Sequence, residues 1–226
     1  MTELFEKQLG VLRTQIDAVD AELLQLLSKR AEHVAEVGRV KHANAIEGSF
    51  IRSGREASMM RDILEKGAGQ FPKEALFSIW RTIISASLKM EGGLKIVMPR
   101  TKSFHMHRLI VEYFGSCSDY ILCDSVDAAL NQVKGNTVGV FNVSDDWWHR
   151  EDVIFGKHKV FAKIHDDIFA LADITPEKTG HDKTLIMTEK EIGDEPYLAY
   201  KNGKWLYEID GYHTEFEGAK VLGNYA

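Results

Sequence analysis

Three cations near the N-terminus could together bind a small dianion. Arg13, Arg30 and Lys41 lie along a stripe that is otherwise apolar and acidic. Arginine makes planar, bidentate contacts with carboxylates, whereas lysine supplies a compact positive charge on a flexible stem. If the three side chains converge, they form a site for a small molecule that carries two negative charges.

The segment that carries these cations is predicted to be one long helix. Apolar residues recur at helical spacing from Leu12 to Val40, with no proline and one glycine, Gly38. A helix over residues 6–44 would be about 58 Å long, whereas the mean helix has about 11–12 residues. A helix of this length cannot bury its apolar stripe inside a compact monomer, so we expect a partner subunit to cover it.

Helix geometry limits which of these cations can act together within one chain. Arg30 and Lys41 are eleven residues apart, so they point to nearly the same side, about 16 Å apart. Arg13 lies about 25 Å before Arg30 along the axis and is rotated off that face. One small ligand therefore cannot touch Arg13 and Lys41 of the same chain. In an intertwined dimer, Arg13 of one subunit could reach the Arg30 and Lys41 of the other.

The composition is that of an ordinary globular protein. The chain has 226 residues, of which 44% are hydrophobic and 27% charged, and its net charge of −6 argues against a general nucleic-acid binder. No apolar run is long enough to span a membrane, and the N-terminus does not resemble a signal peptide. The two cysteines, Cys117 and Cys123, are too few for a disulfide framework and lack metal-ligand spacing. We therefore expect a cytoplasmic protein with no metal.

Two halves of the chain follow different patterns. Residues 1–92 lack strand-like alternation, and glycine and proline punctuation predicts further helices over residues 53–66 and 73–91. From Leu94 onward, strands alternate with helices and then follow one another closely, with Asn202-Gly203 as a hairpin signal. The sequence predicts a multi-domain protein: an all-α three-helix domain over 1–92 and an α/β (α+β) domain over 94–226. Helices are expected over residues 107–114 and 126–133, and strand-like runs at 94–98, 120–123, 137–143, 153–155, 160–164, 184–188, 197–201 and 205–209.

The first half closely resembles the all-helical chorismate mutase family. The matching segments form one collinear block over about 40% of the chain: residues 12–20, 24–30, 37–41, 55–57 and 83–88. The resemblance implies an intertwined helical homodimer with two equivalent sites. These convert chorismate to prephenate on the way to phenylalanine and tyrosine. The reaction is an intramolecular rearrangement, so no cofactor is implied.

The resemblance also implies a role for each cation. Arg13 of the partner chain would bind one carboxylate of chorismate and Arg30 the other, while Lys41 would contact the ether oxygen and Glu56 the ring hydroxyl. The enzyme must fold a flexible dianion into a compact, chair-like conformer, which is catalysis by orientation. Negative charge develops on the ether oxygen as the C–O bond breaks, so the fixed cation of Lys41 stabilises the transition state preferentially.

Four further positions belong to the implied site. Ser87 and Glu91 lie one turn apart on the third predicted helix and would complete the wall of the implied site. Arg55 lies in the matched segment at residues 55–57. Family members have Gln or Glu at the position of Glu91, facing the ether oxygen, so a carboxyl there must carry its proton to donate a hydrogen bond. Arg52 stands where many relatives have Asp, and we expect it to affect substrate binding more than the reaction class.

The second half is similar to a prephenate dehydratase domain without its catalytic signatures. The junction at residues 87–97 and the segment at 135–144 carry the resemblance. Residues 98–102 replace the expected Gly-Pro-x-Gly-Thr loop, no Glu-Asn-Ser element occurs near Asn142–Ser144, and Thr184-Leu185-Ile186 replaces Thr-Arg-Phe. We therefore expect residues 94–226 to be a degenerate dehydratase-like domain that is not catalytic. Stabilising the dimer, binding an aromatic effector or docking a pathway enzyme remain open as its roles.

Several alternatives remain at this stage. An isochorismate–pyruvate lyase shares the helical fold and a similar cation set, and a regulatory or scaffold protein of the chorismate pathway would bind without turnover. A dehydratase with an altered site is a third alternative. Trp147-Trp148 is expected at a strand-end turn, half in the core and half on the surface, unless it stacks on a ligand. His105 and His107, at i and i+2, do not share a helix face and are not expected to bind a metal.

Overall fold

The computed structural model describes residues 3–43, 51–67, 69–100, 103–193 and 195–226. The chain divides into two compact units, residues 1–46 and 47–226, and each is described by itself. The first unit contains α1 (Glu3–Ala43), a single helix of 41 residues and therefore about 60 Å long. The long helix predicted over residues 6–44 is confirmed as far as Ala43, and Asn44 lies outside the described residues. Its apolar side chains are exposed on the single chain, Leu24 by 69% and Leu26 by 63%.

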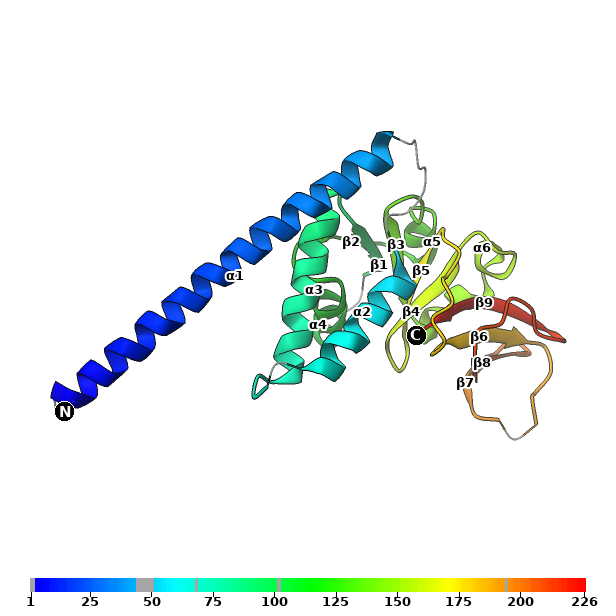
Figure 1. Cartoon of the computed structure of the whole chain (residues 1–226). Coiled ribbons are helices and arrows are strands. Elements are labelled where there is room, and N and C mark those ends of the chain that lie inside the picture. Colours follow the sequence, from blue (N-terminus) through cyan, green and yellow to red (C-terminus); the bar gives the residue numbers. More distant parts are fainter. Residues whose placement is uncertain (1–2, 44–50, 68, 101–102, 194) are drawn as a thin grey trace. The chain divides into compact units, whose positions relative to one another are not determined.

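The second unit begins with the two remaining helices of the predicted helical half. These are α2 (Ser53–Lys66), which ends at Gly67, and α3 (Lys73–Met90), which follows Pro72. Both helices lie where the glycine and proline punctuation predicted them. Helix α3 contacts both α2 and α4 (Phe104–Phe114), so the helical segment is continuous with the sheet-bearing part of the chain (Figure 1).

The rest of the second unit is built on a mixed sheet. Its strand order within the described residues is β2-β1-β3-β5-β4-β9-β6-β8-β7. Strands β1, β2 and β3 are parallel, as expected for strands joined through helices, and the remaining neighbours are antiparallel except β4 and β9. The strands are β1 (Lys95–Pro99), β2 (Asp119–Cys123), β3 (Thr137–Asn142), β4 (Lys159–His165), β5 (Ile168–Ala172), β6 (Lys183–Thr188), β7 (Tyr197–Lys201), β8 (Lys204–Asp210) and β9 (Ala219–Tyr225).

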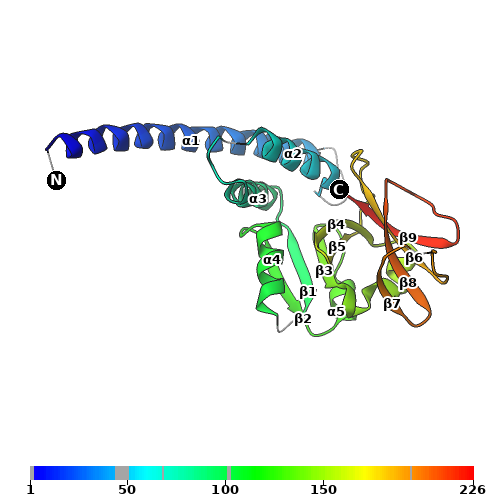
Figure 2. The same cartoon turned by 90° about the horizontal axis from the view of Figure 1, so that it is seen from below.

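Two apolar clusters cover the two faces of this sheet. Alternation along β1 sends Ile96 and Met98 to one face and Val97 to the other. The first face packs against α4 and receives Leu88 of α3, while the second packs against α5 (Val126–Leu130). Figure 2 shows α4 and α5 on opposite sides of β1 and β3. The predicted combination of an all-α segment with an α/β (α+β) region is therefore confirmed. Among the described residues, no helix is long and apolar enough to cross a membrane.

Several details of the sheet region differ from the sequence predictions, among them α5, which ends at Leu130 rather than at Val133. The strand-like run at 153–155 belongs to the short helix α6 (Glu151–Ile154) and the residue after it, because its apolar residues are too few to distinguish a strand from a helix turn. Strands β5 and β9 were not predicted. Trp147 and Trp148 are both fully buried rather than half exposed, because the turn that carries them folds back onto the sheet. The hairpin at Asn202-Gly203 is confirmed, and both residues have the positive φ of a type I′ turn.

An ionic network around the half-buried Glu208 joins four strands of the sheet. The Glu208 carboxylate on β8 accepts hydrogen bonds from Lys163 Nζ on β4 (2.8 Å), Lys183 Nζ on β6 (3.0 Å) and the Tyr225 hydroxyl on β9 (2.6 Å). Burial raises the pKa of Glu208, but these three donors outweigh it and lower the pKa from 4.5 to about 2. Glu208 therefore stays ionised in the folded protein at any pH near neutrality.

Replacing Glu208 by Gln is expected to lower the free energy of unfolding at neutral pH by about 3 kcal/mol. Because the folded-state pKa of Glu208 is depressed, its stabilisation is complete above the unfolded pKa of 4.5 and is lost as the pH falls towards about 2. Urea unfolding at neutral pH and at about pH 3 measures this difference. Glu217→Gln, at an exposed glutamate, is the matched control. Equal stability of Glu208→Gln and wild type at neutral pH would contradict the assignment.

Candidate active site

The cations of α1 keep the geometry that the sequence predicts. The helix is continuous from Arg13 to Lys41, so Arg30 and Lys41 lie about 16 Å apart on nearly the same side. Both side chains are partly exposed, and Arg13, nearer the start of the helix, is exposed. This face of α1 thus presents two fixed positive charges, and a third lies about 42 Å from Lys41 along the same axis.

Glu56 lies in a small, mostly apolar cavity of the second unit. It is on the first turns of α2, its side chain is 22% exposed, and its Oε2 lies 3.6 Å from Nη1 of Arg81 on α3. Tyr113 of α4 lines the same cavity. Burial raises the pKa of Glu56, the Arg81 cation and a backbone hydrogen bond from Arg52 lower it, and the charge of Glu91 raises it, with a net increase above 4.5.

Ser87 lies in the last turn of α3 and Glu91 directly after it. The buried Ser87 hydroxyl donates to the carbonyl of Ile83 (2.7 Å). The backbone N–H of Glu91, which caps the helix, donates to the carbonyl of Ser87 (3.2 Å). The Glu91 charge acts on the pKa of Glu56. Glu56, Ser87 and Glu91 all belong to the second unit.

The two remaining predicted residues lie at the start of α2. The Arg52 guanidinium is bound by Glu177, with Nε 2.6 Å from Oε1, and Gly54 packs closely against the same glutamate. Arg55 is exposed. Arg52 is thus tied to the loop after β5, and binding to a substrate would require this ion pair to open.

Arg81 and Tyr113 were missed by the sequence analysis. Arg81 is 7% exposed and its Cζ lies 4.0 Å from the centre of the Tyr113 ring. The signal for Arg81 was available, because it is a charged residue within the apolar run Ile79–Ile84 of an amphipathic helix. No comparable signal marks Tyr113, since its place beside α3 depends on the tertiary packing of α4.

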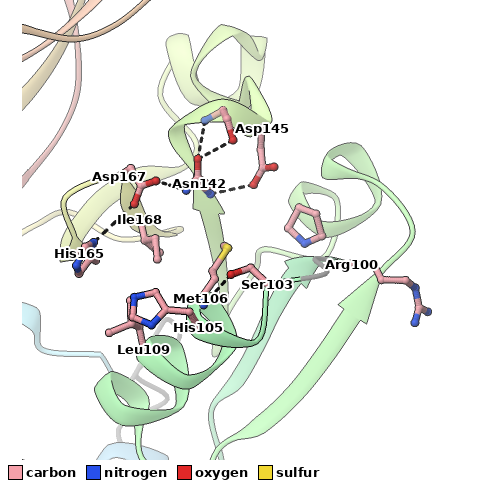
Figure 3. Close-up of a pocket in the computed structure, with 12 residues that line it drawn as sticks. Arg100, Ser103, His105, Met106, Leu109, Asn142, Asp145, His165, Asp167 and Ile168 are labelled. Carbon is pink, nitrogen blue, oxygen red and sulfur yellow. Dashed lines mark hydrogen bonds and ion pairs between the residues drawn. The ribbon is translucent and has the colours of Figure 1, made fainter.

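A second cleft, of about 560 Å³, lies at the carboxyl ends of β1 and β3. Pro99 and Arg100 line it from one strand and Asn142 and Ser144 from the other, so two of the three replaced dehydratase segments meet here (Figure 3). The third does not, because Thr184 is buried within hydrogen-bond distance of the Asn224 side chain (2.6 Å).

The polar groups of this cleft mainly bind one another. Asn142 Nδ2 donates to Asp167 (2.5 Å), and the Asp145 carboxylate accepts from the backbone N–H of Asn142 (2.9 Å). Burial raises the pKa of Asp145, the hydrogen bond from Asn142 lowers it, and the nearby Asp146 and Asp167 raise it. His105 and His165 face each other across the entrance with ring centres 6.1 Å apart. Among the described residues that line it, the cleft holds acidic and imidazole groups and the exposed Arg100, but no buried cation for a dianionic substrate.

Comparisons with known proteins show what the helical segment is similar to. Residues 12–92 match the family described as Chorismate mutase type II. A bifunctional chorismate mutase/prephenate dehydratase of Aquifex aeolicus is 30% identical over 161 residues, covering 65% of this chain and 44% of the relative. The protein of the same name from Neisseria gonorrhoeae is 28% identical over 134 residues, covering 59% and 36%.

The T-protein of Enterobacter agglomerans is 36% identical over 98 residues, covering 42% of this chain and 26% of its own. The chain therefore spans less than half the length of these curated relatives. Since residues 1–92 are less than half of the chain, a match over 65% continues into the sheet-bearing part. No solved structure gives a significant match.

Proposed function

We propose that this chain, whose residues 12–92 form a chorismate mutase type II domain, converts chorismate to prephenate. The observation that carries the proposal is that the matched segment contains a complete set of groups for a folded dianion. Arg13, Arg30 and Lys41 supply the cations, and Glu56, Ser87 and Glu91 supply the polar groups. A binding protein without turnover has no need of the whole set.

The chemistry assigned to each group follows from charge. Arg30 binds one carboxylate of the substrate, and Arg13 of a second copy binds the other. Together they hold the substrate in its chair-like conformer. Lys41 stabilises the charge that develops on the ether oxygen, and Glu91 is proposed to face the same atom. Ionised Glu56 accepts the hydrogen bond of the ring hydroxyl. The reaction forms and breaks bonds within one molecule and requires no cofactor.

The working form is proposed to be an intertwined homodimer. Exposed apolar residues run along most of α1, among them Val11, Ile16, Val19, Leu23 and Leu27, and a second copy of the helix would bury them. The same pairing would bring Arg13 of one copy to the Arg30 and Lys41 of the other, which one chain alone cannot do. Arg52 and Arg55 are proposed as secondary substrate contacts, with Arg52 released from Glu177 when it takes part.

Residues 94–226 are proposed to be a dehydratase-like domain without dehydratase activity. The extent of the match to the Aquifex relative supports the ancestry. The replaced segments at the second cleft and the burial of Thr184 support the loss of catalysis. We also propose that the protein acts in the cytoplasm, where Cys117 and Cys123 remain the free thiols seen in the structure.

The alternative functions make different products. An isochorismate–pyruvate lyase would release salicylate and pyruvate from isochorismate, and a regulatory or scaffold protein would leave both substrates intact. The continuation of the relatives' match into the dehydratase-like half favours the mutase, because that fusion belongs to phenylalanine synthesis.

The deciding experiment gives the purified full chain chorismate, isochorismate or prephenate in separate reactions and identifies the products by chromatography. We expect prephenate from chorismate and no phenylpyruvate from prephenate. Salicylate from isochorismate, with chorismate untouched, would establish the lyase. Phenylpyruvate would show that the second half retains catalysis, and no turnover of any substrate would favour the scaffold.

A further inference from the structure

We propose that Arg81 and Tyr113 are positioning residues for Glu56, so that the sheet-bearing half of the chain is a working part of the mutase site. The inference rests on the proposed function and goes beyond it in two respects. It assigns a role to a buried arginine outside the predicted set. It also gives residues 94–226 a task that needs no catalysis of their own.

Arg81 lies at a buried position, where an unpaired guanidinium would lower the free energy of unfolding. It is 7% exposed, and its Nε has no hydrogen-bond partner among the described residues. A buried charge destabilises the fold unless it is paired, and replacing such a pair by apolar residues is often neutral or stabilising. The one carboxylate that the structure pairs with Arg81 within the described residues is Glu56, at 3.6 Å. We therefore assign the Arg81–Glu56 pair to holding the Glu56 carboxylate in position rather than to raising the free energy of unfolding.

Tyr113 fixes the other side of the guanidinium. The Arg81 Cζ lies 4.0 Å from the centre of the Tyr113 ring and 5.2 Å from that of Phe77, which is the geometry of a cation–π contact. Phe77 belongs to α3 itself, whereas Tyr113 is on α4 of the sheet-bearing half. The position of α4 therefore determines where the Arg81 guanidinium lies.

The packing of α4 on α3 is tight enough to transmit that constraint. The Ser85 hydroxyl accepts from the backbone N–H of Cys117 (3.1 Å) and lies 3.2 Å from the Ser118 hydroxyl. Gly115, with φ of 76°, packs so closely that a Cβ there would lie 2.5 Å from Cβ of Ser85. Only glycine meets both requirements. The contact holds Tyr113, Arg81 and Glu56 in one chain of packed groups.

The charged groups around Glu56 make the contact among Tyr113, Arg81 and Glu56 measurable as a pH dependence. Arg81 on α3, the backbone of Arg52 before α2, Glu91 at the end of α3 and the Tyr113 hydroxyl on α4 are the titratable or polar groups that act around it. Removing the Arg81 cation removes the largest influence that lowers the pKa of Glu56. Glu56 must be ionised to accept the hydrogen bond of the substrate hydroxyl. As the pH is lowered, activity should therefore be lost at a higher pH in the variant than in the wild type.

The test is the pH profile of kcat/KM for chorismate in full-length Arg81→Met. We expect its acidic limb to move up by about one pH unit or more relative to wild type. In a Glu56→Gln background, the same substitution should leave the limb where Glu56→Gln alone places it. Lys89→Met is the matched control, because Lys89 is a cation on the same helix that pairs with Asp119 (2.8 Å) rather than with Glu56. Its limb should coincide with that of wild type.

Tyr113→Leu tests the contribution of the sheet-bearing half and also serves if Arg81→Met is too unstable to assay. Tyr113→Leu should shift the acidic limb in the same direction by a smaller amount. The reason is that Arg81 keeps its charge but loses its contact with the Tyr113 ring. The inference would be overturned if the acidic limb were unshifted in both variants, or if the shift persisted in the Glu56→Gln background. The proposed function would still stand in either case, provided that the wild-type protein converts chorismate. An inactive wild type would instead overturn the proposed function and this inference with it.

Discussion

Lys41→Ala is expected to lower kcat for chorismate by about 10²–10³-fold. The ether oxygen gains negative charge only as the C–O bond breaks, so a cation at that atom stabilises the transition state more than the bound substrate. KM should change less than kcat, because Arg30 and Arg13 would still hold the two carboxylates. Steady-state kinetics at a fixed ionic strength measure both parameters.

Lys29→Ala is the matched control for this prediction. Lys29 is an exposed cation on the same helix, twelve residues before Lys41, and it has no role in the proposed site. Its removal changes the net charge of the protein by the same amount and should leave kcat unchanged. An equal loss in both variants would mean that the general field of α1, and not a contact of Lys41, accelerates the reaction.

Arg13→Ala is expected to reduce kcat/KM by about 10²-fold although Arg13 lies about 42 Å from Lys41 on the same helix. The reason is that Arg13 would act in the site of the partner chain, where a charge-assisted contact to a substrate carboxylate is lost. Size-exclusion chromatography should show an unchanged dimer, because the apolar residues of α1 remain. Lys7→Ala removes another exposed cation near the same end of α1 and should retain full activity.

The helical half could be predicted closely because its signals are local. The apolar spacing of α1, Gly67 after α2 and Pro72 before α3 each act within a few residues, and they mark these helices almost to the residue. The hairpin at Asn202-Gly203 was predictable for the same reason, since a type I′ turn requires positive φ at both positions.

The remainder depended on contacts between distant segments. Strand β9 includes Gly223, whose backbone approaches Val160 of β4 so closely that a side chain is excluded, and no local pattern shows this. The burial of Trp147 and Trp148 depends on their turn folding onto β3 and β5. Of the candidate site, the residues of α1, Glu56, Ser87 and Glu91 were named from their motif positions. The pairing of Glu56 with Arg81 and Tyr113 joins three helices and appears only in the fold.

The central claim is that the protein is a chorismate mutase whose sites are each built from two chains. Its most direct test is to unfold and refold an equal mixture of the inactive variants Arg13→Ala and Lys41→Ala and then measure chorismate turnover. A mixed dimer contains one site with both Arg13 and Lys41 intact, so the mixture should recover about one quarter of wild-type activity. Each variant refolded alone should stay inactive. No recovery in the mixture, with dimers re-formed, would contradict the claim.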